Sequence, residues 1–202
     1  MKYRNIVFDY GNVIGKFDGR QMMQSFCDTE EDCGLLCSVI FEKWAELDRG
    51  TLDYEAYRQQ CIQRLPDALT APAEAFFRGW TDLVRPIPQT IRLIEELTGQ
   101  GVPVYLLSNA PTFFADRMKD SPLLKRFSGV VFSAPLKMVK PEPAIYEYLF
   151  RTYNLKPEEC FFLDDLEPNV NTARSLGMDS MVFTGDIEKV RSAIGFPAPK
   201  GA

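Results

Sequence analysis

The chain has 202 residues, of which 46% are hydrophobic and 25% charged, a balance typical of a globular protein with one core domain and room for a small insertion. The formal net charge of −5 argues against nucleic acid or an anionic membrane surface as a partner, because both need a basic face. The chain contains no histidine, which excludes mechanisms based on Ser-His, Cys-His or His-metal chemistry.

The lack of a recognisable targeting segment and the pattern of cysteines predict an intracellular protein. No apolar segment has the length of a membrane span, and the N-terminus lacks the apolar stretch of a signal peptide, so we expect a cytoplasmic protein. The five cysteines are scattered and odd in number. Cys33 and Cys37 lie four apart on a predicted helix, but without histidine or a C-x-x-C pair we interpret the cysteines as buried free thiols.

The first predicted strand delivers a carboxylate into a turn. Residues 6–8 form a short apolar run, and Asp9 follows it directly, ahead of Gly11 and Asn12. Buried parallel strands have such runs, and in open α/β sheets the ligand crevice lies at their carboxyl ends. Asp9 is therefore a candidate nucleophile or metal ligand. The alternative is an aspartate in an ordinary turn after a strand.

The next seventy residues, roughly, have a helical pattern throughout. Thr29 resembles a capping residue at the start of one helix, and Gly50 marks the end of another. Thr70 and Pro72 are predicted to open the last helix of this block. Aromatic residues recur at helical spacing here, which is more typical of packing than of ligand contact. We predict a helical bundle at residues 15–85, inserted into another domain.

From residue 86 onward, predicted strands and helices alternate. The strands are expected at residues 102–107, 129–133, 160–163 and 180–183, and the helices at residues 91–97, 113–118, 123–127, 144–153, 169–176 and 187–194. Such alternation produces a parallel sheet through right-handed crossovers. The predicted fold class is α/β: a Rossmann-like parallel-sheet core of residues 1–14 and 86–202, with the bundle as a cap domain. The Pro-rich tail from Pro197 is expected to be frayed.

Polar residues follow the later strands as well. Ser108 and Asn109 follow the second strand, Lys140 lies in the loop after the third, and Asp164 and Asp165 follow the fourth. Taken singly, Ser108 has an ordinary explanation as a strand-end cap and Lys140 as a solvated loop residue, but complementary chemistry at four strand ends indicates one site. Carboxylates without His or Cys favour Mg²⁺. The hydroxyl of Ser108 and the ammonium of Lys140 suit the oxygens of a phosphoryl group.

These motifs resemble those of the haloacid dehalogenase-like (HAD) hydrolase superfamily, and the resemblance covers essentially the whole chain. The matching motifs, in order, are Phe8–Val13, Leu106–Asn109, Lys140–Tyr146 and Phe162–Asn169. The helical block is similar to the family's helical cap. The pair Gly11-Asn12 and the stretch Leu47–Leu52 look most like bacterial sugar-phosphate phosphatases of the α-D-glucose-1-phosphatase kind.

The resemblance implies a phosphatase that uses Mg²⁺ as its cofactor. Asp9 is expected to attack phosphorus in line and to form an aspartyl-phosphate that water hydrolyses. The expected Mg²⁺ ligands are Asp9, the carbonyl oxygen of Gly11 and Asp165, with Asp164 acting through water or through Lys140. The expected phosphoryl-binding groups are Ser108, the Asn109 amide and Lys140. This assignment agrees with the physics of phosphoryl transfer, which depends mostly on positioning and charge stabilisation.

One position departs from the family pattern. In most phosphatases of the superfamily, an aspartate two residues after the nucleophile is the general acid and base, but this chain has Gly11 there. Metal coordination survives because it needs only a backbone carbonyl. Proton transfer, typically worth about 10²–10⁴-fold, lacks its usual group. A good leaving group suffers least from that loss, so a sugar 1-phosphate fits as a substrate.

Two other functions stay open at this stage. A 2-haloacid dehalogenase would use the same nucleophile without a metal, although the pair Asp164-Asp165 argues against it. A degenerate, non-catalytic binding protein with the HAD fold is the second alternative. The candidate substrate contacts are Lys16, Phe17, Arg20 and Trp44 in the cap, and Asn169 in the core. We expect a monomer or a weak dimer that acts on a small phosphorylated molecule.

Overall fold

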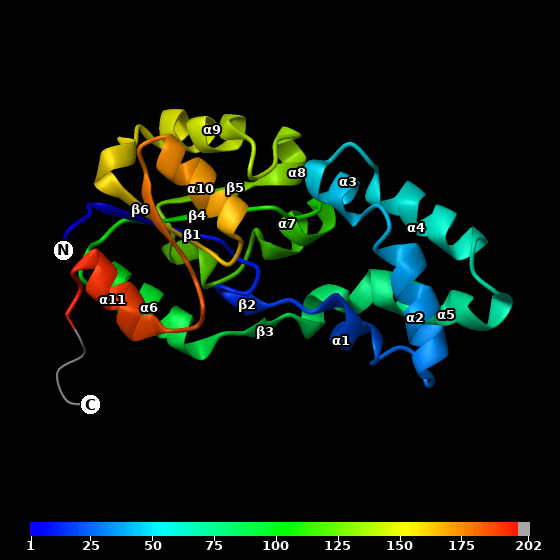
Figure 1. Cartoon of the computed structure of the whole chain (residues 1–202). Coiled ribbons are helices and arrows are strands. Elements are labelled where there is room, and N and C mark those ends of the chain that lie inside the picture. The colour runs from blue at the N-terminus through cyan, green and yellow to red at the C-terminus, as the bar shows by residue number, and fades with distance from the viewer. Residues whose placement is uncertain (198–202) are drawn as a thin grey trace.

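A five-stranded parallel sheet forms the centre of the computed structural model, which describes residues 1–197 (Figure 1). The strands, in spatial order, are β5 (Gly129–Phe132), β4 (Val104–Ser108), β1 (Asn5–Phe8), β6 (Cys160–Asp164) and β7 (Asp179–Val182). All neighbouring pairs are parallel. The predicted α/β fold class is confirmed. Because β1 is the central strand, the residue after it enters the middle of the sheet's carboxyl edge.

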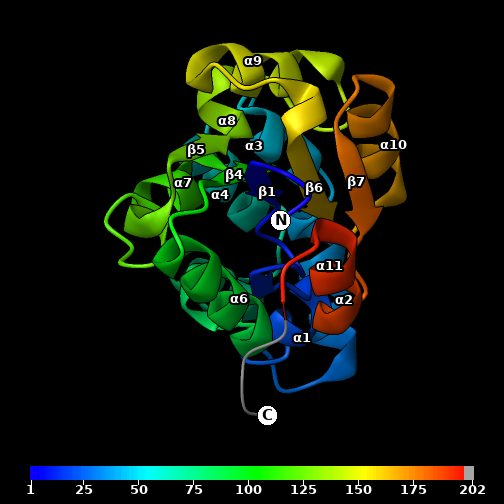
Figure 2. The same ribbon diagram turned by 90° about the vertical axis from the view of Figure 1, so that its left-hand side faces the viewer.

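Helices cover both faces of the sheet (Figures 1 and 2). The four long ones are α6 (Pro88–Gly99) and α11 (Ile187–Ile194) on one face, and α9 (Pro143–Tyr153) and α10 (Glu167–Ser175) on the other. Successive strand residues point to opposite faces, so Ile6 and Phe8 of β1 pack in the core under α6 and α11, while Val7 packs in the core under α9. Both faces of β1 are therefore buried, which explains its uninterrupted apolar run.

Short helical segments also connect the strands. They are α7 (Thr112–Met118), α8 (Ser133–Leu136) and the 3₁₀ turns η2 (Leu124–Arg126) and η3 (Pro157–Glu159). The strand predicted at residues 129–133 is one residue too long, because Ser133 begins α8. The helix predicted at residues 123–127 is the single 3₁₀ turn η2. The expected frayed tail beyond Pro197 lies outside the described residues.

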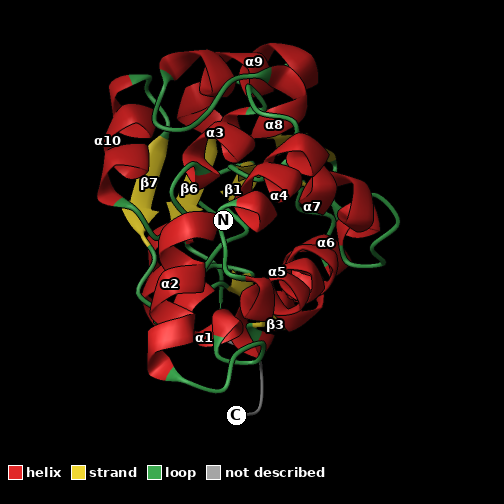
Figure 3. Ribbon diagram, turned by 90° about the vertical axis from the view of Figure 1, so that its right-hand side faces the viewer, coloured by secondary structure: helices red, strands yellow, loops and turns green. Residues whose placement is uncertain are grey.

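Between β1 and α6 the chain leaves the sheet and forms a bundle at one end of the molecule (Figure 1), the end that faces the viewer in Figure 3. We call residues 17–84 the helical insert. Its elements are α1 (Gly19–Met23), α2 (Glu30–Ile40), α3 (Trp44–Arg49), α4 (Tyr54–Gln63), α5 (Asp67–Gly79) and the 3₁₀ turn η1 (Trp80–Leu83). Thr29 caps α2 as predicted, accepting a hydrogen bond from the backbone N–H of Asp32 at 3.1 Å. Gly50 ends α3 with φ 72°, a conformation that favours glycine.

The predicted start of the last insert helix is wrong. Thr70 and Pro72 do not open α5, which begins at Asp67 and contains Pro72 within its second turn. A proline there removes one early hydrogen bond of the helix. The buried stripe of Leu69, Ala73 and Phe76 crosses that position, so packing against the insert core keeps the segment helical.

Two very short strands connect the helical insert to the sheet (Figure 1). β2 (Gly15–Lys16) and β3 (Arg85–Pro86) pair antiparallel, and the N–H of Ile87 donates to the carbonyl of Ile14 at 2.8 Å. This pairing falls at the two boundaries predicted for the cap domain. Sequence analysis did not identify either strand, because two residues are too few to show a periodic pattern.

Two further observations concern the chain as a whole. Among residues 1–197, the helices are too short or too polar to cross a membrane. The prediction of buried thiols is correct for Cys33, Cys61 and Cys160 but wrong for Cys27 and Cys37, which are only partly buried. Cys27 precedes α2 and Cys37 lies on it, and both pack against the insert core while keeping some exposure.

Candidate active site

The carboxyl edge of the sheet brings together the polar residues that follow the strands. Asp9 follows β1, Ser108 ends β4, Asp164 ends β6, and Lys140 reaches them from the loop before α9. All four are buried, with Asp9 6% exposed and Asp164 0% exposed. Lys140 Nζ lies 2.8 Å from Asp9 Oδ1 and 2.6 Å from Asp164 Oδ2. A buried ammonium between two buried carboxylates is the centre of the site.

The charges in this centre shift one another's pKa values. Burial raises the pKa of Asp9 to about 7; the ammonium of Lys140 opposes that shift, and the charge of Asp164 adds to it. Burial alone lowers the pKa of Lys140, but Asp9 and Asp164 outweigh burial and hold it above its ordinary value. Lys140 therefore stays protonated at neutral pH and supplies a fixed positive charge next to Asp9.

A third carboxylate completes a cluster with the donor chemistry of a magnesium site. Asp9, Asp164 and Asp165 each offer an oxygen, and these oxygens lie within 4.8 Å of one another. Asn12 Nδ2 donates to Asp165 Oδ2 at 3.0 Å, while burial raises the pKa of Asp165. Asp9 Oδ1 is buried without a well-directed hydrogen bond. The cluster is all oxygen and its carboxylates outnumber the ammonium, so a divalent cation fits it.

Two asparagines hold the charged residues in place. Asn109 Nδ2 donates to the carbonyl of Lys140 at 2.9 Å, and the N–H of Lys140 donates back to Asn109 Oδ1 at 2.8 Å. This reciprocal pair holds the backbone of Lys140 against the end of β4. Asn169 is buried and donates to Asp164 Oδ1 at 2.9 Å, next to the N–H of Leu166 at the same distance. Asn169 thus orients Asp164 and does not line the cavity.

A cavity of about 270 Å³ opens above the cluster, between the sheet edge and the helical insert. The sheet side contributes polar groups: Asp9, Gly11, Asn12, Ser108, Asn109 and Asp165. Of the predicted substrate contacts in the insert, Phe17 and Trp44 line the cavity. Lys16 and Arg20 do not, because Lys16 is exposed beside β3 and Arg20 forms an exposed ion pair with Glu30. Their expected role in substrate contact has no support in the geometry.

Facing the polar sheet edge is a group of aromatic rings, which we call the aromatic wall: Phe17, Trp44 and Trp80 of the insert together with Tyr10 and Phe114 of the sheet domain. Trp80 stands at its middle, stacked on Phe114 at 5.6 Å and edge-on to Trp44 at 5.3 Å between ring centroids. The indole N–H of Trp80 donates to Tyr54 Oη at 2.9 Å, so its polar atom is already used. The wall therefore offers apolar surface to a ligand.

Sequence analysis missed one acidic residue of this cavity. Asp48, near the end of α3, lines the cavity together with the aromatic wall. Burial raises its pKa to about 7, with a further contribution from the charge of Asp9 and an opposing one from Lys140. Its only signal in the sequence is its place two residues before Gly50, within the Leu47–Leu52 stretch that resembled the family. Nothing local marks which way an acid on a short helix faces.

Comparison with known proteins identifies the class. The sequence profile of the haloacid dehalogenase-like hydrolases matches residues 3–177, and the chain belongs to that family of hydrolases. The family predicted from the four motifs is confirmed.

Particular relatives cover almost the whole chain. The sesquiterpene phosphatase astK of Aspergillus oryzae is 27% identical over 190 residues, which span 92% of this chain and 92% of the relative. The D-ribitol-5-phosphate phosphatase of Bacteroides thetaiotaomicron is 26% identical and covers 88% of this chain and 90% of its own. A HAD family enzyme of Bacteroides thetaiotaomicron, solved in complex with magnesium and inorganic phosphate, has the same fold, with a TM-score of 0.72 at 20% identity over 91% of this chain and 96% of its own.

Proposed function

We propose that this hydrolase is a Mg²⁺-dependent phosphatase that releases phosphate from a small organic monoester, with Asp9 as its nucleophile. The observation that carries the proposal is the buried cluster of Asp9, Lys140, Asp164 and Asp165 beneath a cavity of ligand size. Two relatives of nearly equal length are phosphatases, which supports the same activity here.

The roles follow from the chemistry of phosphoryl transfer. Asp9 attacks phosphorus in line and takes the phosphoryl group as an aspartyl-phosphate, and water then hydrolyses it. Lys140 holds Asp9 and faces the phosphoryl oxygens with a positive charge, and the Ser108 hydroxyl donates to one of them. Asp9, the carbonyl of Gly11 and Asp165 would hold Mg²⁺, and Asp164 fixes Lys140. Bound Mg²⁺ neutralises the negative charge that this site gathers.

The substrate has two candidate classes. The resemblance to sugar-phosphate phosphatases favours a phosphorylated sugar. The aromatic wall favours a phosphate of a more apolar alcohol, because Trp80 and its neighbours offer ring faces and, among the described residues, no Lys or Arg lines the cavity on the insert side. The relative that acts on a sesquiterpene is consistent with the second class.

The test of activity uses the whole chain with p-nitrophenyl phosphate. Phosphate release that needs Mg²⁺ and disappears in Asp9→Asn is expected. Chloride release from 2-chloropropionate without any metal would instead identify a dehalogenase. Binding of phosphate without turnover of any ester would identify a non-catalytic protein.

The test of substrate class compares glucose 6-phosphate with hexyl phosphate. Both have a primary alcohol as leaving group, so the ratio of their kcat/KM values reports on pocket contacts rather than on leaving-group chemistry. A ratio in favour of hexyl phosphate supports the apolar class, and a ratio in favour of glucose 6-phosphate supports the sugar class.

A further inference from the structure

The site as described lacks a group that gives a proton to the leaving alcohol. Gly11 stands where most phosphatases of the family have that acid. In an in-line displacement the leaving oxygen departs on the side of phosphorus opposite the nucleophile. With Asp9 at the sheet edge, that side is the helical insert, which lies beyond the carboxyl ends of the strands (Figure 1). A proton donor is therefore needed on the insert.

Four titratable side chains of the described residues line the cavity: Asp9, Tyr10, Asp48 and Asp165. Asp9 is the nucleophile, and Asp165 lies in the metal cluster with Asn12 bonded to it. Burial raises the pKa of Tyr10, which makes its phenol a weaker acid than usual. Asp48 is the one carboxyl that comes from the insert side.

The end of α3 is fixed to the sheet domain, so Asp48 has a defined position. The hydroxyl of Ser133, the first residue of α8, donates to the backbone carbonyl of Asp48. The same hydroxyl oxygen accepts from the N–H of Ala110, the residue after Asn109, at 2.9 Å. One serine thus connects the backbone of Asp48 to the chain that leaves β4 at the site.

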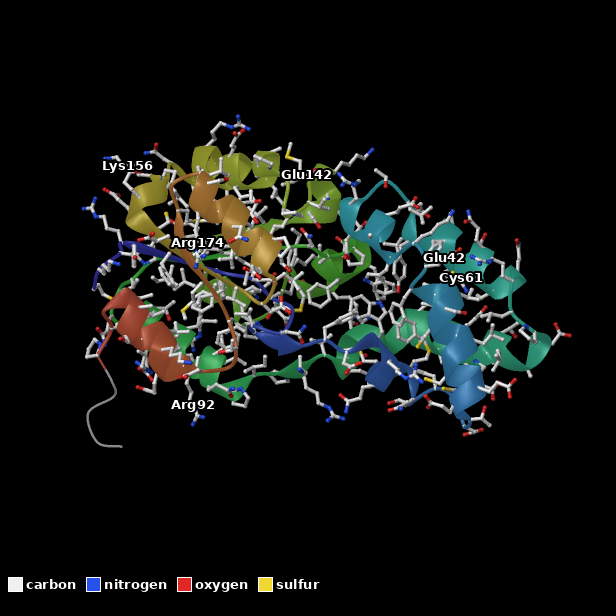
Figure 4. The ribbon with its side chains drawn as sticks, viewed as in Figure 1. Glu42, Cys61, Arg92, Glu142, Lys156 and Arg174 are labelled. Atoms are coloured by element: carbon white, nitrogen blue, oxygen red, sulfur yellow. The ribbon has the colours of Figure 1, made fainter. Side chains whose placement is uncertain are left out.

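Two further contacts hold this junction. Arg49 forms a two-pronged pair with Glu142 at 2.6 and 3.1 Å, and Glu142 lies on the core beside the insert (Figure 4). A Cβ on Gly50 would lie 2.1 Å from the carbonyl oxygen of Ala134, so only glycine allows this approach. The three residues Asp48, Arg49 and Gly50 form one docked segment, and the side chain of Asp48 lines the cavity.

We propose that Asp48 is the general acid and base of the hydrolysis, in place of the carboxyl that is missing at Gly11. The proposal rests on the proposed phosphatase function and deepens it. Burial favours the protonated carboxyl of Asp48, as its raised pKa indicates, so the group is able to start the reaction as an acid.

The proton balance closes over two steps. In the first, Asp9 forms a bond to phosphorus, the bond from phosphorus to the ester oxygen breaks, and the departing oxygen takes its electron pair and the proton of Asp48. In the second, the carboxylate of Asp48 accepts a proton from water as the water oxygen bonds to phosphorus and the bond to Asp9 breaks. The products are an alcohol and inorganic phosphate, and both aspartates return to their starting state.

A proton donor at Asp48 changes what the missing acid at Gly11 implies about the substrate. The expectation of a sugar 1-phosphate came from the absence of a proton donor, which would restrict the enzyme to good leaving groups. With Asp48 in that role, alcohols that are poor leaving groups become accessible, and the sugar-phosphate prediction depends on the resemblance alone.

The test is the leaving-group dependence of kcat/KM, which reports the first step only. Asp48→Asn should lower kcat/KM for phenyl phosphate by about 10²–10⁴-fold, and for p-nitrophenyl phosphate by less than about 10-fold, because nitrophenolate leaves without a proton. Acid quenching should show that the variant accumulates aspartyl-phosphate, since its second step lacks a base. Glu46→Gln, an exposed acid on the same helix, is the matched control and should leave both values unchanged.

A rescue variant separates loss of an acid from loss of structure. A Cβ at Gly11 would meet nothing within 4 Å, so the backbone there has room for the first atom of a side chain, which makes Gly11→Asp a suitable variant. Gly11→Asp combined with Asp48→Asn should restore most of the phenyl phosphate activity. Equal losses on both esters, or no loss, would overturn the role of Asp48 while leaving the phosphatase intact. A wild-type protein that hydrolyses neither ester would overturn the phosphatase function itself, and this role with it.

Discussion

The two sides of the cavity are built on different principles. The sheet side places charged residues at strand ends and buries them almost completely. Bonds to the backbone or to other polar side chains hold them in place, as when Asp164 pairs with Lys140 and accepts from Asn169. The insert side presents most of the aromatic wall and a single carboxyl, Asp48. In the proposed reaction, the sheet side holds and transfers the phosphoryl group, and the insert side selects the alcohol and gives it a proton.

The difference predicts how each side responds to substitution. A strand end sits on the most rigid part of the fold, so changes there should remove the chemistry altogether. The insert connects to the sheet through β2, β3 and the α3 junction, so changes there, apart from those at Asp48, should alter affinity and selectivity by smaller amounts. The following predictions test that contrast, beginning with the largest effect.

Asp9→Asn should reduce phosphatase kcat by at least about 10⁴-fold, because a neutral amide does not form the acyl phosphate. The replacement is nearly isosteric, so the far-UV circular dichroism should stay that of the wild type. Phosphate release from p-nitrophenyl phosphate measures the effect. A folded variant with near-normal turnover would show that the nucleophile lies elsewhere.

Chelation should abolish activity, and Mg²⁺ should restore it where Ca²⁺ does not, because the larger ion takes looser, higher coordination. Asp165→Ala should lose the Mg²⁺ response more completely than Asp164→Ala. Calorimetric titration with MgCl₂ measures binding apart from turnover. Full activity after exhaustive chelation would contradict a metal-dependent site.

Asp164→Ala should instead cost stability, by about 1–3 kcal/mol, because it leaves the buried amide of Asn169 without its acceptor and Lys140 with Asp9 as its remaining carboxylate. Asp165→Ala, whose side chain is partly exposed, should cost much less. Urea denaturation of both variants without metal measures the difference. Equal losses would mean that the two neighbouring acids share one role.

Trp44→Ala on the insert side should raise KM for hexyl phosphate by about 10-fold or more while changing kcat little, because it removes apolar contact surface from the cavity. Phe26→Ala is the control, since Phe26 packs on Phe76 in the insert and does not line the cavity. A KM increase of the same size in both variants would indicate general loosening of the insert.

Arg49→Ala should have the smallest effect on stability, about 0.2–1 kcal/mol, since its pair with Glu142 is partly exposed to solvent. A double-mutant cycle with Glu142→Ala, followed by urea denaturation, isolates the pair. A coupling energy well above 1 kcal/mol would show that this contact, rather than Ser133 and Gly50, dominates the docking of α3.

The sequence alone determined the sheet and its reactive edge. Short apolar runs that lead to Asp9, Ser108 and Asp164 indicate strands that are buried on both faces of the sheet. Because these strands are parallel, their carboxyl ends lie at one edge of the sheet. The α/β fold and the family followed from that local information. In the structure these polar residues lie next to one another, and Asn169 bonds to Asp164 rather than lining the cavity.

The residues that stand opposite that edge are placed by contacts between distant parts of the chain. The position of Asp48 depends on Ser133 and Ala134, about eighty-five residues further along the chain, and a helical pattern does not encode such a contact. The helical spacing of aromatic residues such as Trp80 suggested packing, and Trp80 does pack on Trp44, yet both rings also face the cavity. Periodicity shows that a side chain is buried; whether it is buried against its own bundle or against a ligand depends on how the insert docks on the sheet.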